Sequence, residues 1–331
     1  MVKVPKGYRS KNVRDTRNVG NSRSSGRTFG GGSRRSSSRG SLSGGTPRGS
    51  QARPGGCGSG LILVLVVVAF IVFSCVGDGP LDTGPATNTA TNSGNGVVDN
   101  VDSGAVNNSD SQREEDAFDL INFITDDLQL EFWPEEFAEA GLNYELATVE
   151  VFENDVTTGG CGRATSAVGP FYCPADNTAY IDIEYMFLLQ EQLGAQGDFS
   201  AAYILAHEIA HHVQNLLGIN GALRTLQSSA SQVESNALQV SLELQADCFA
   251  GAWADSFNVR FADNPDIGLE EGDLEEGVNA AGAVGDDAIT GSTNQENFTH
   301  GSSAQRIEWF NIGFNEGTDS CTTFDGALTP G

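Results

Sequence analysis

A run of 17 residues without charge, GLILVLVVVAFIVFSCV at positions 60–76, divides this chain into two parts of opposite character. Both flanks are too polar to cover such a run, so water is an unfavourable environment for it. Its length lies at the short end of the roughly 17–25 residues with which a helix crosses a bilayer. We therefore predict a transmembrane helix at residues 60–76. A buried core strand and a cleaved signal peptide are the alternatives, and the long basic region before the run argues against the second.

The charges on the two sides of this run differ in sign. Thirteen of the 18 Lys and Arg residues precede position 57, together with a single acid, Asp15. Residues 78–331 contain five arginines, no lysine and 43 acids. Because Lys and Arg next to a membrane helix stay on the cytoplasmic side, we predict a single-pass protein of the cell membrane with a cytoplasmic N-terminus and an extracytoplasmic acidic part.

Composition also divides the chain into segments. Residues 1–59 consist mainly of Ser, Gly and Arg, which predicts a disordered, solvated tail. Such a tail could also contact anionic lipid or nucleic acid, but we predict no nucleic-acid partner. Residues 77–114 contain GPATNTATNSGNG and predict a flexible acidic linker. Residues 115–324 remain as a folded domain that is long enough to bury a core, followed by a C-terminal tail at residues 325–331.

The folded domain combines both kinds of secondary structure. Apolar residues at helical spacing, with capping and breaking residues at their ends, predict helices over residues 116–140 (interrupted at Pro134), 199–217, 232–257 and 270–287. Alternating apolar residues predict strands over residues 145–152 and 178–185. Because the strands come early and the helices later, we expect an α+β domain with a small sheet rather than a doubly wound sheet.

The chain has six cysteines, of which Cys57 and Cys75 flank or lie in the predicted membrane helix. The four others belong to the domain, and an even number outside the cytoplasm predicts two disulfides; they are Cys161, Cys173, Cys248 and Cys321. Four cysteines allow three pairings, among which the sequence alone does not choose. Pairing the first two closes a short loop that contains Gly and Pro, and leaves the last two for each other. Free thiols or a metal site are the alternative.

Three of the four histidines fall in AHEIAHHVQ, residues 206–214. On a helix, His207 and His211 lie one turn apart on the same face, so both imidazoles can bind one ion. Glu208 points about 100° away around the helix, a position from which it can accept a hydrogen bond from a water at the metal. This is the H-E-x-x-H arrangement in which the glutamate acts as general base. His212 faces away from the pair, and we interpret it as a supporting or surface histidine.

A catalytic zinc usually has three protein ligands and one open position. The candidates for the third ligand are Glu243, Asp247, His300 and the cysteines. Glu243 and Asp247 lie four residues apart in ELQAD, within a predicted helix. One carboxylate can bind the ion while the other accepts the free N–H of a ligand histidine and fixes its orientation. We assign Glu243 as the ligand and Asp247 as the orienting group; two unrelated acids of an acid-rich helix are the alternative.

The sequence resembles the neutral zinc metallopeptidase family of bacterial single-pass membrane proteins. The matching segments occur in the family's order and cover most of residues 115–324: CGRATSAVGPFYCPADNTAYIDIEY, GDFSAAYILAHEIAHHVQNLLGI, ELQADCFAGAWA, GDLEEGVNAAGAVGDD and FTHGSSAQRIEWF. The resemblance implies zinc, peptide-bond hydrolysis and a zincin-like helical domain with a small antiparallel sheet. HExxH followed by E-x-x-A-D also resembles the gluzincins, which implies the same roles for Glu243 and Asp247.

The predicted function is therefore a membrane-anchored zinc metallopeptidase that acts on a peptide or protein substrate. His207, His211 and Glu243 hold Zn²⁺, and Glu208 takes a proton from the attacking water and passes it to the leaving amine. The excess of acids could attract cationic substrates, although solubility in a salty exterior is the simpler explanation. The sequence indicates neither the substrate nor the oligomeric state.

The developing oxyanion needs a donor in addition to the metal. His300 in THGSSAQR is our first candidate for this donor, and Arg306 or Tyr185 is the next. A purely structural hydrogen bond is the alternative for His300. By analogy with zincins, TAYIDIEY at residues 178–185 would be the sheet edge that pairs with an extended substrate.

Two other functions compete with this prediction. In a deformylase-like hydrolase, Cys161 would join the HExxH histidines as a ligand, although an oxidising compartment and a disulfide partner at Cys173 argue against it. In a membrane-anchored binding or scaffold module, the zinc would be structural. The intact Glu208 argues for catalysis, because a structural site is normally closed by a fourth ligand and needs no base.

Overall fold

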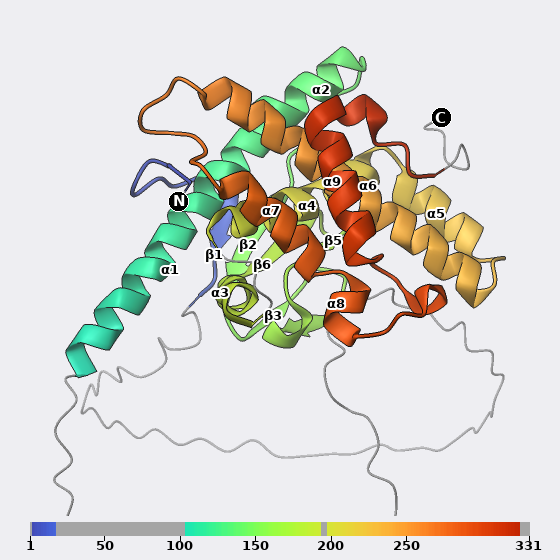
Figure 1. Cartoon of the computed structure of the whole chain (residues 1–331), viewed down its shortest axis with the longest axis horizontal. Coiled ribbons are helices and arrows are strands. Elements are labelled where there is room, and N and C mark those ends of the chain that lie inside the picture. Colours follow the sequence, from blue (N-terminus) through green and yellow to red (C-terminus); the bar gives the residue numbers. More distant parts are fainter. Residues whose placement is uncertain (1, 18–102, 193–196, 325–331) are drawn as a thin grey trace, which may run out of the picture. The chain divides into compact units, whose positions relative to one another are not determined.

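The structure of the protein is a computed structural model that describes residues 2–17, 103–192 and 197–324 (Figure 1). The predicted transmembrane helix at residues 60–76, most of the predicted linker and the C-terminal tail lie outside these ranges and stay predictions. Among the helices of the described ranges, none combines the length and the apolar character that a bilayer crossing requires.

One sheet has the strand order β1-β2-β6-β5, formed by Val13–Asp15, Thr148–Phe152, Thr178–Asp182 and Phe171–Cys173. β2 pairs in parallel with both β1 and β6, whereas β5 pairs with β6 in the antiparallel sense. The expected antiparallel sheet is therefore wrong, and the sheet is mixed. The physical reason lies in the connections: β5 and β6 are joined by a short turn, whereas the chain between β2 and β6 is long enough for a parallel crossover.

The segment TAYIDIEY is divided between two elements. Its first five residues form β6, which has β2 on one side and β5 on the other, so the expected free edge for a substrate is wrong. Its last three residues begin α3, Ile183–Gln192. The Asp182 side chain accepts hydrogen bonds from the backbone N–H groups of Glu184 (3.0 Å) and Tyr185 (3.3 Å), which starts the helix and ends the strand.

Residues 2–17 belong to the folded unit, so the prediction of disorder is wrong for them. Val2 is buried in the main core, and β1 extends the sheet beside β2. Basic residues of this segment form ion pairs with acids of the domain: Lys6 with Asp116, Arg9 with Asp119, Arg14 with Glu150 and Arg17 with Glu114. The segment has little apolar surface of its own, and the prediction could not take into account the acidic surface that receives it.

The first long helical region runs through Pro134 without stopping. It consists of α1 (Ser103–Asp126), a π-helical segment (Asp127–Phe132) and α2 (Trp133–Glu139). Pro134 is the second residue of α2 and follows directly on the π-helical segment, so the residue without an N–H lies where the helical hydrogen-bonding pattern already changes. The π-helical segment presents Asp127 to α6, where it accepts hydrogen bonds from Trp253 and Arg260.

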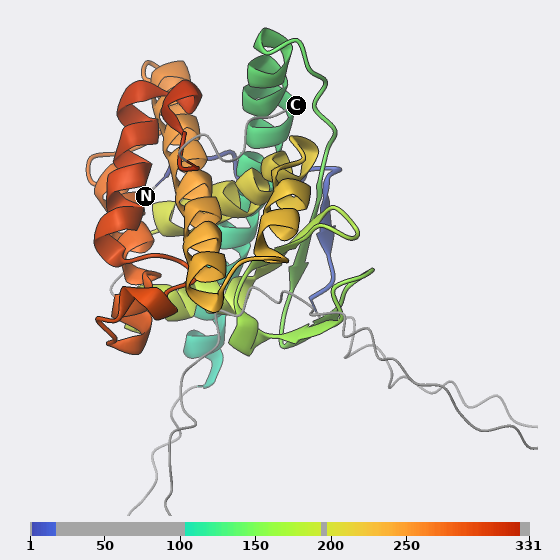
Figure 2. The same ribbon diagram turned by 90° about the vertical axis from the view of Figure 1, so that its right-hand side faces the viewer.

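Helix α4, Phe199–Leu216, lies at the centre of the domain. Every residue from 199 to 214 is buried, because α4 packs against the sheet on one side and against α6 and α7 on the other (Figure 2). As predicted, Asp198 precedes the helix and Gly218 follows it, with a φ of 75°. The Asp198 side chain does not cap α4, however, because it accepts a hydrogen bond from the Val2 backbone.

The C-terminal half supplies the second layer of helices. α6 (Gln232–Phe261) starts at a capping box formed by Ser231 and Glu234. α7 (Asp273–Ala283) and α9 (Ser303–Glu316) pack on each other (Figure 1). α7 also packs on α4, and α9 packs on α6. Shorter elements complete the described fold: β3 (Asp155–Thr157), β4 (Arg163–Thr165), α5 (Ile219–Gln227), α8 (Asp286–Thr290) and the 3-10 turns Ser166–Val168, Gln295–Asn297 and Thr318–Ser320.

Two disulfides connect these layers at their edges. Cys161 is bonded to Cys173, which ties the loop between β3 and β4 to β5. Cys248 is bonded to Cys321, which ties α6 to the segment after α9. Of the three possible pairings, this is the one in which the first two cysteines close a short loop.

Helices α6 and α9 approach each other closely enough that a methyl group does not fit between them. A Cβ atom on Gly313 would lie 1.8 Å from the backbone oxygen of Cys248. We expect Gly313→Ala to lower the free energy of unfolding by about 3 kcal/mol, because the overpacked backbone must move. Thermal or urea unfolding of the full chain measures this. Gly221→Ala in α5 is the matched control, since open space surrounds its Cβ position. Equal stability of the two variants would contradict the close packing.

Candidate metal centre

The three predicted metal ligands come together between α4 and α6. His207 and His211 lie one turn apart on α4, and Glu243 lies on the facing side of α6; all three are buried. Their potential ligand atoms all lie within 4.8 Å of one another. The Glu243 Oε2 atom is 3.1 Å from His207 Nε2 and 3.6 Å from His211 Nε2.

Each histidine is held in orientation through its other ring nitrogen. His207 Nδ1 lies 2.8 Å from Asp247 Oδ1, as predicted from the spacing of ELQAD. His211 Nδ1 lies 2.8 Å from Gln214 Oε1, a partner that the sequence analysis missed although it follows three residues later on the same helix. The Gln214 amide nitrogen donates to Leu242 O, at 2.7 Å, so its oxygen must face His211. Both Nδ1–H groups are thus donors, which leaves both Nε2 lone pairs for an ion.

The charges of the site also fit a divalent cation. Burial would raise the pKa of Glu243, but the two neighbouring imidazoles hold it well below its ordinary value. Burial would lower the pKa of His207, but the carboxylates of Asp247 and Glu243 raise it to about 9. Two buried carboxylates therefore face the histidines from α6 and favour positive charge between them. Two imidazole nitrogens and one carboxylate oxygen are the ligand set of many catalytic zinc sites.

Glu208 lines a pocket together with the three predicted ligands, His207, His211 and Glu243. The pocket has a cavity volume of about 40 Å³, enough for water beside the ligands. Glu208 is 8% exposed, and burial raises its pKa, partly offset by the two histidines. An acidic side chain at this place can accept a proton from a water in the pocket, as the HExxH pattern predicted.

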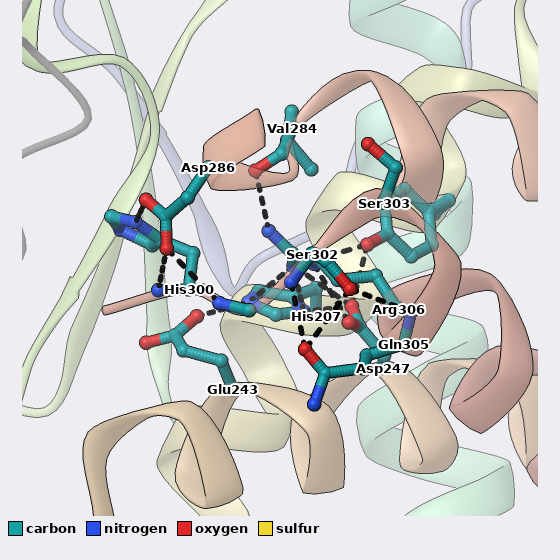
Figure 3. A network of polar contacts seen from close by, with 12 residues as sticks. His207, Glu243, Asp247, Val284, Asp286, His300, Ser302, Ser303, Gln305 and Arg306 are labelled. Carbon is teal, nitrogen blue, oxygen red and sulfur yellow. Dashed lines mark hydrogen bonds and ion pairs between the residues drawn. The ribbon is translucent and has the colours of Figure 1, made fainter. Parts of the chain in front are cut away.

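His300 reaches the same pocket from the loop before α9. Its Nδ1 lies 3.1 Å from Asp286 Oδ1, and the other oxygen of Asp286 accepts the backbone N–H groups of Thr299, His300 and Gly301. Asp286, which the sequence analysis missed, therefore fixes both the loop and the ring (Figure 3). Gly301 has a φ of 90°, which turns the chain from His300 into the cap of α9.

The structure also places the two residues named after His300 as candidate donors to the oxyanion. Arg306 lines the pocket, but it donates to Asp247 and lies behind His207 (Figure 3). Tyr185 lines the pocket, and burial raises its pKa to about 12, so its hydroxyl stays protonated. Tyr203, which the sequence analysis missed, donates its hydroxyl to Asp247 from one turn before His207.

Two sequence candidates lie away from the pocket. His212 is fully buried and joins α4 to the sheet region: its Nε2 donates to the Glu145 carbonyl at 2.7 Å and its Nδ1 lies 2.9 Å from the Tyr172 hydroxyl. It is outside the site, as predicted, but it is neither a surface residue nor a support for the ligands. Cys161 is bonded to Cys173, so the deformylase-like arrangement with a Cys161 thiolate is wrong.

Comparison with known proteins agrees with a zinc site. A family described as "Putative neutral zinc metallopeptidase" matches residues 5–324 of the chain. The uncharacterized protein YpfJ of Escherichia coli is 44% identical over 201 residues, which cover 59% of this chain and 68% of YpfJ. The uncharacterized protein Rv2575 of Mycobacterium tuberculosis is 43% identical over 198 residues, which cover 56% of this chain and 64% of Rv2575. No solved structure matches the chain.

Proposed function

Because this chain belongs to the family of neutral zinc metallopeptidases, we propose that it hydrolyses peptide bonds with zinc held by His207, His211 and Glu243. One observation carries the proposal. The Nε2 atoms of both histidines and a Glu243 oxygen converge at one point, while both Nδ1 atoms are already engaged. A histidine pair with a merely structural role has no need to direct two Nε2 atoms at the same carboxylate oxygen.

The residues around this point have distinct tasks. When bound there, the ion supplies Lewis-acid chemistry: it polarises a substrate carbonyl and lowers the pKa of a water toward about 7. Glu208 accepts the proton of the attacking water and transfers it to the nitrogen of the leaving amine. In its imidazolium form, His300 would donate its Nε2–H to the oxygen on which negative charge develops, while Asp286 accepts its Nδ1–H. Asp247 and Gln214 keep the ligand rings in place.

A peptide digest tests this function directly. The full chain is incubated with a library of unstructured peptides, with and without a zinc chelator, and new peptide termini are identified by mass spectrometry. We expect cleavage that the chelator abolishes and added zinc restores. A chain that contains zinc but cleaves nothing would contradict the peptidase function and favour a binding module.

We further propose that the domain lies outside the cytoplasm. Its two disulfides support this, because disulfides persist mainly in oxidising compartments. The apolar run at residues 60–76 remains our predicted site of membrane attachment. The side on which the N-terminus lies is a separate question, since β1 pairs with β2 of the domain.

A single span at residues 60–76 places its two flanks on opposite sides of the membrane. A docked β1 requires residues 2–17 and the domain to lie on the same side, so both cannot hold in one chain. We propose the docked arrangement, in which the N-terminus is extracytoplasmic. The charge bias had predicted a cytoplasmic N-terminus instead. Residues 60–76 then begin and end on the same side of the membrane.

Cysteine labelling distinguishes the two arrangements. Cys57 and Cys75 are replaced by Ser, and one cysteine is introduced either at Lys11 or at Val259, which is 65% exposed on α6. The tagged full chain in right-side-out cell preparations is treated with a membrane-impermeant maleimide. We expect both positions to react. Reaction at Val259→Cys alone would contradict the docked arrangement. It would show that the N-terminus is cytoplasmic and that β1 does not pair with β2 in the membrane-attached protein.

A further inference from the structure

A fully buried cluster of charged and polar groups lies behind the His207 ring. Its members are Asp247, Arg306 and Tyr203, which are 0%, 3% and 1% exposed. They come from α6, α9 and α4, so three helices meet at this point (Figure 3). Residues 78–331 contain only five arginines against 43 acids, and one of those five is placed here.

The Asp247 carboxylate is saturated with donors. Its Oδ1 accepts hydrogen bonds from His207 Nδ1 (2.8 Å), from the Tyr203 hydroxyl (2.5 Å) and from Arg306 Nη2 (2.9 Å). Its Oδ2 accepts from Arg306 Nε (2.8 Å). The guanidinium therefore binds both oxygens, which fixes the plane of the carboxylate as well as its charge.

The guanidinium is itself held in place on its far side. Arg306 Nη1 donates to the Val284 carbonyl at 3.1 Å, and Nη2 also donates to the Tyr203 hydroxyl at 3.2 Å. The Tyr203 hydroxyl can accept from Arg306 while it donates to Asp247, so the three groups form a closed ring of hydrogen bonds. Rotation of any one side chain would break contacts of the other two.

This arrangement has a consequence for His207. Without the guanidinium that binds both of its oxygens, the buried Asp247 carboxylate would be free to rotate. Rotated, Asp247 would no longer hold the His207 Nδ1–H, and the ring could turn away from Glu243. An immobile Asp247 is what keeps the Nε2 atom of His207 directed toward Glu243.

We infer that Arg306 and Tyr203 are positioning residues for His207, and that they set the metal affinity of the site through Asp247. The inference rests on the proposed zinc site and adds the two residues that prepare one of its ligands before metal arrives. Both also line the pocket, so a direct contact with substrate is the competing role. Metal binding without substrate separates the two.

The experiment compares zinc affinity across matched variants of the full chain, by competition with a chromophoric chelator. We expect Arg306→Lys to weaken zinc binding by about 10–100-fold, the usual effect of losing a group that orients a metal ligand, and Tyr203→Phe to weaken it by less. Arg260→Lys is the control, because Arg260 also binds a buried carboxylate with two nitrogens, that of Asp127, in contacts of α6 with the π-helical segment rather than in the pocket. It should bind zinc like the unchanged chain.

Cobalt substitution supplies a second measurement. The visible absorption of Co²⁺ reports ligand geometry, and we expect it to shift in Arg306→Lys and Tyr203→Phe but not in Arg260→Lys. Tyr203→Phe removes a single oxygen and keeps the test available if the arginine variant does not fold. Unchanged zinc affinity and cobalt spectra in both variants would overturn the inference, even if hydrolysis were lost. Failure of the unchanged chain to bind zinc would instead overturn the proposed function.

Discussion

Glu208→Gln is expected to lower kcat/KM for peptide hydrolysis by about 10²–10⁴-fold, the contribution of a general base, while the chain still binds zinc. The substitution keeps the shape of the side chain but removes its ability to accept a proton from water. Glu208 lines the pocket beside the proposed ligands, so the loss follows from chemistry rather than from unfolding. Hydrolysis of a substrate found in the digest, with zinc measured on the same sample, gives both quantities.

The control for this variant is another buried glutamate. Glu150 in β2 is 7% exposed and pairs with Arg14, outside the pocket. Glu150→Gln should keep most of the hydrolytic rate. Full activity in Glu208→Gln would remove its role as base, and loss of zinc from that variant would mean that Glu208 contributes to binding the ion.

Glu243→Gln is expected to reduce zinc affinity more than 100-fold, because removing a ligand should exceed the roughly 10–100-fold effect of removing an orienting group. An amide oxygen is a poorer zinc ligand than a carboxylate, and the charge that faces the two histidines is lost. Zinc per chain, measured by elemental analysis after dialysis, should fall from about one to near zero. Zinc retained in full would contradict the assignment of the third ligand.

A second group of acids makes a suitable control for this result. Asp198, Asp273 and Glu276 also lie close enough to hold an ion. Carboxylates alone suit Mg²⁺ or Ca²⁺ better than zinc, and two of them already accept hydrogen bonds from the Val2 and Phe199 backbone. Glu276→Gln should therefore leave the zinc content unchanged. Loss of zinc in Glu276→Gln but not in Glu243→Gln would show that the metal binds at the second group of acids instead.

Patterns within single helices predicted the centre of the site. His207 and His211, and likewise Glu243 and Asp247, are four residues apart, and helical geometry alone places each pair on one face. The apolar positions around them predicted the two helices that carry them. The roles of these four residues, and the exclusion of His212, followed from these local rules.

The partners contributed by other elements could not be predicted in the same way. Arg306 was expected only as an alternative donor to the oxyanion, yet it binds Asp247, which lies 59 positions earlier in the chain. Asp286 is 14 positions from the His300 ring that it holds. No local pattern marks such contacts, because they exist only once α7, α8 and α9 have packed.

The sheet shows the same division. Alternating apolar residues predicted β2 and β6 as strands, but not their parallel pairing or the position of β6 inside the sheet. The segment 2–17 looked disordered because it has little apolar content of its own. Its ion pairs with α1 and β2 involve acids about 100 positions or more away.

The sequence by itself therefore determined the helices of the site and the candidate ligand residues on them, because both depend on spacings of a few residues along one helix. Only the tertiary structure decided which groups orient those residues, on which edge of the sheet β1 lies and which side chains line the pocket. These features depend on contacts between distant segments, which form only when the core is assembled.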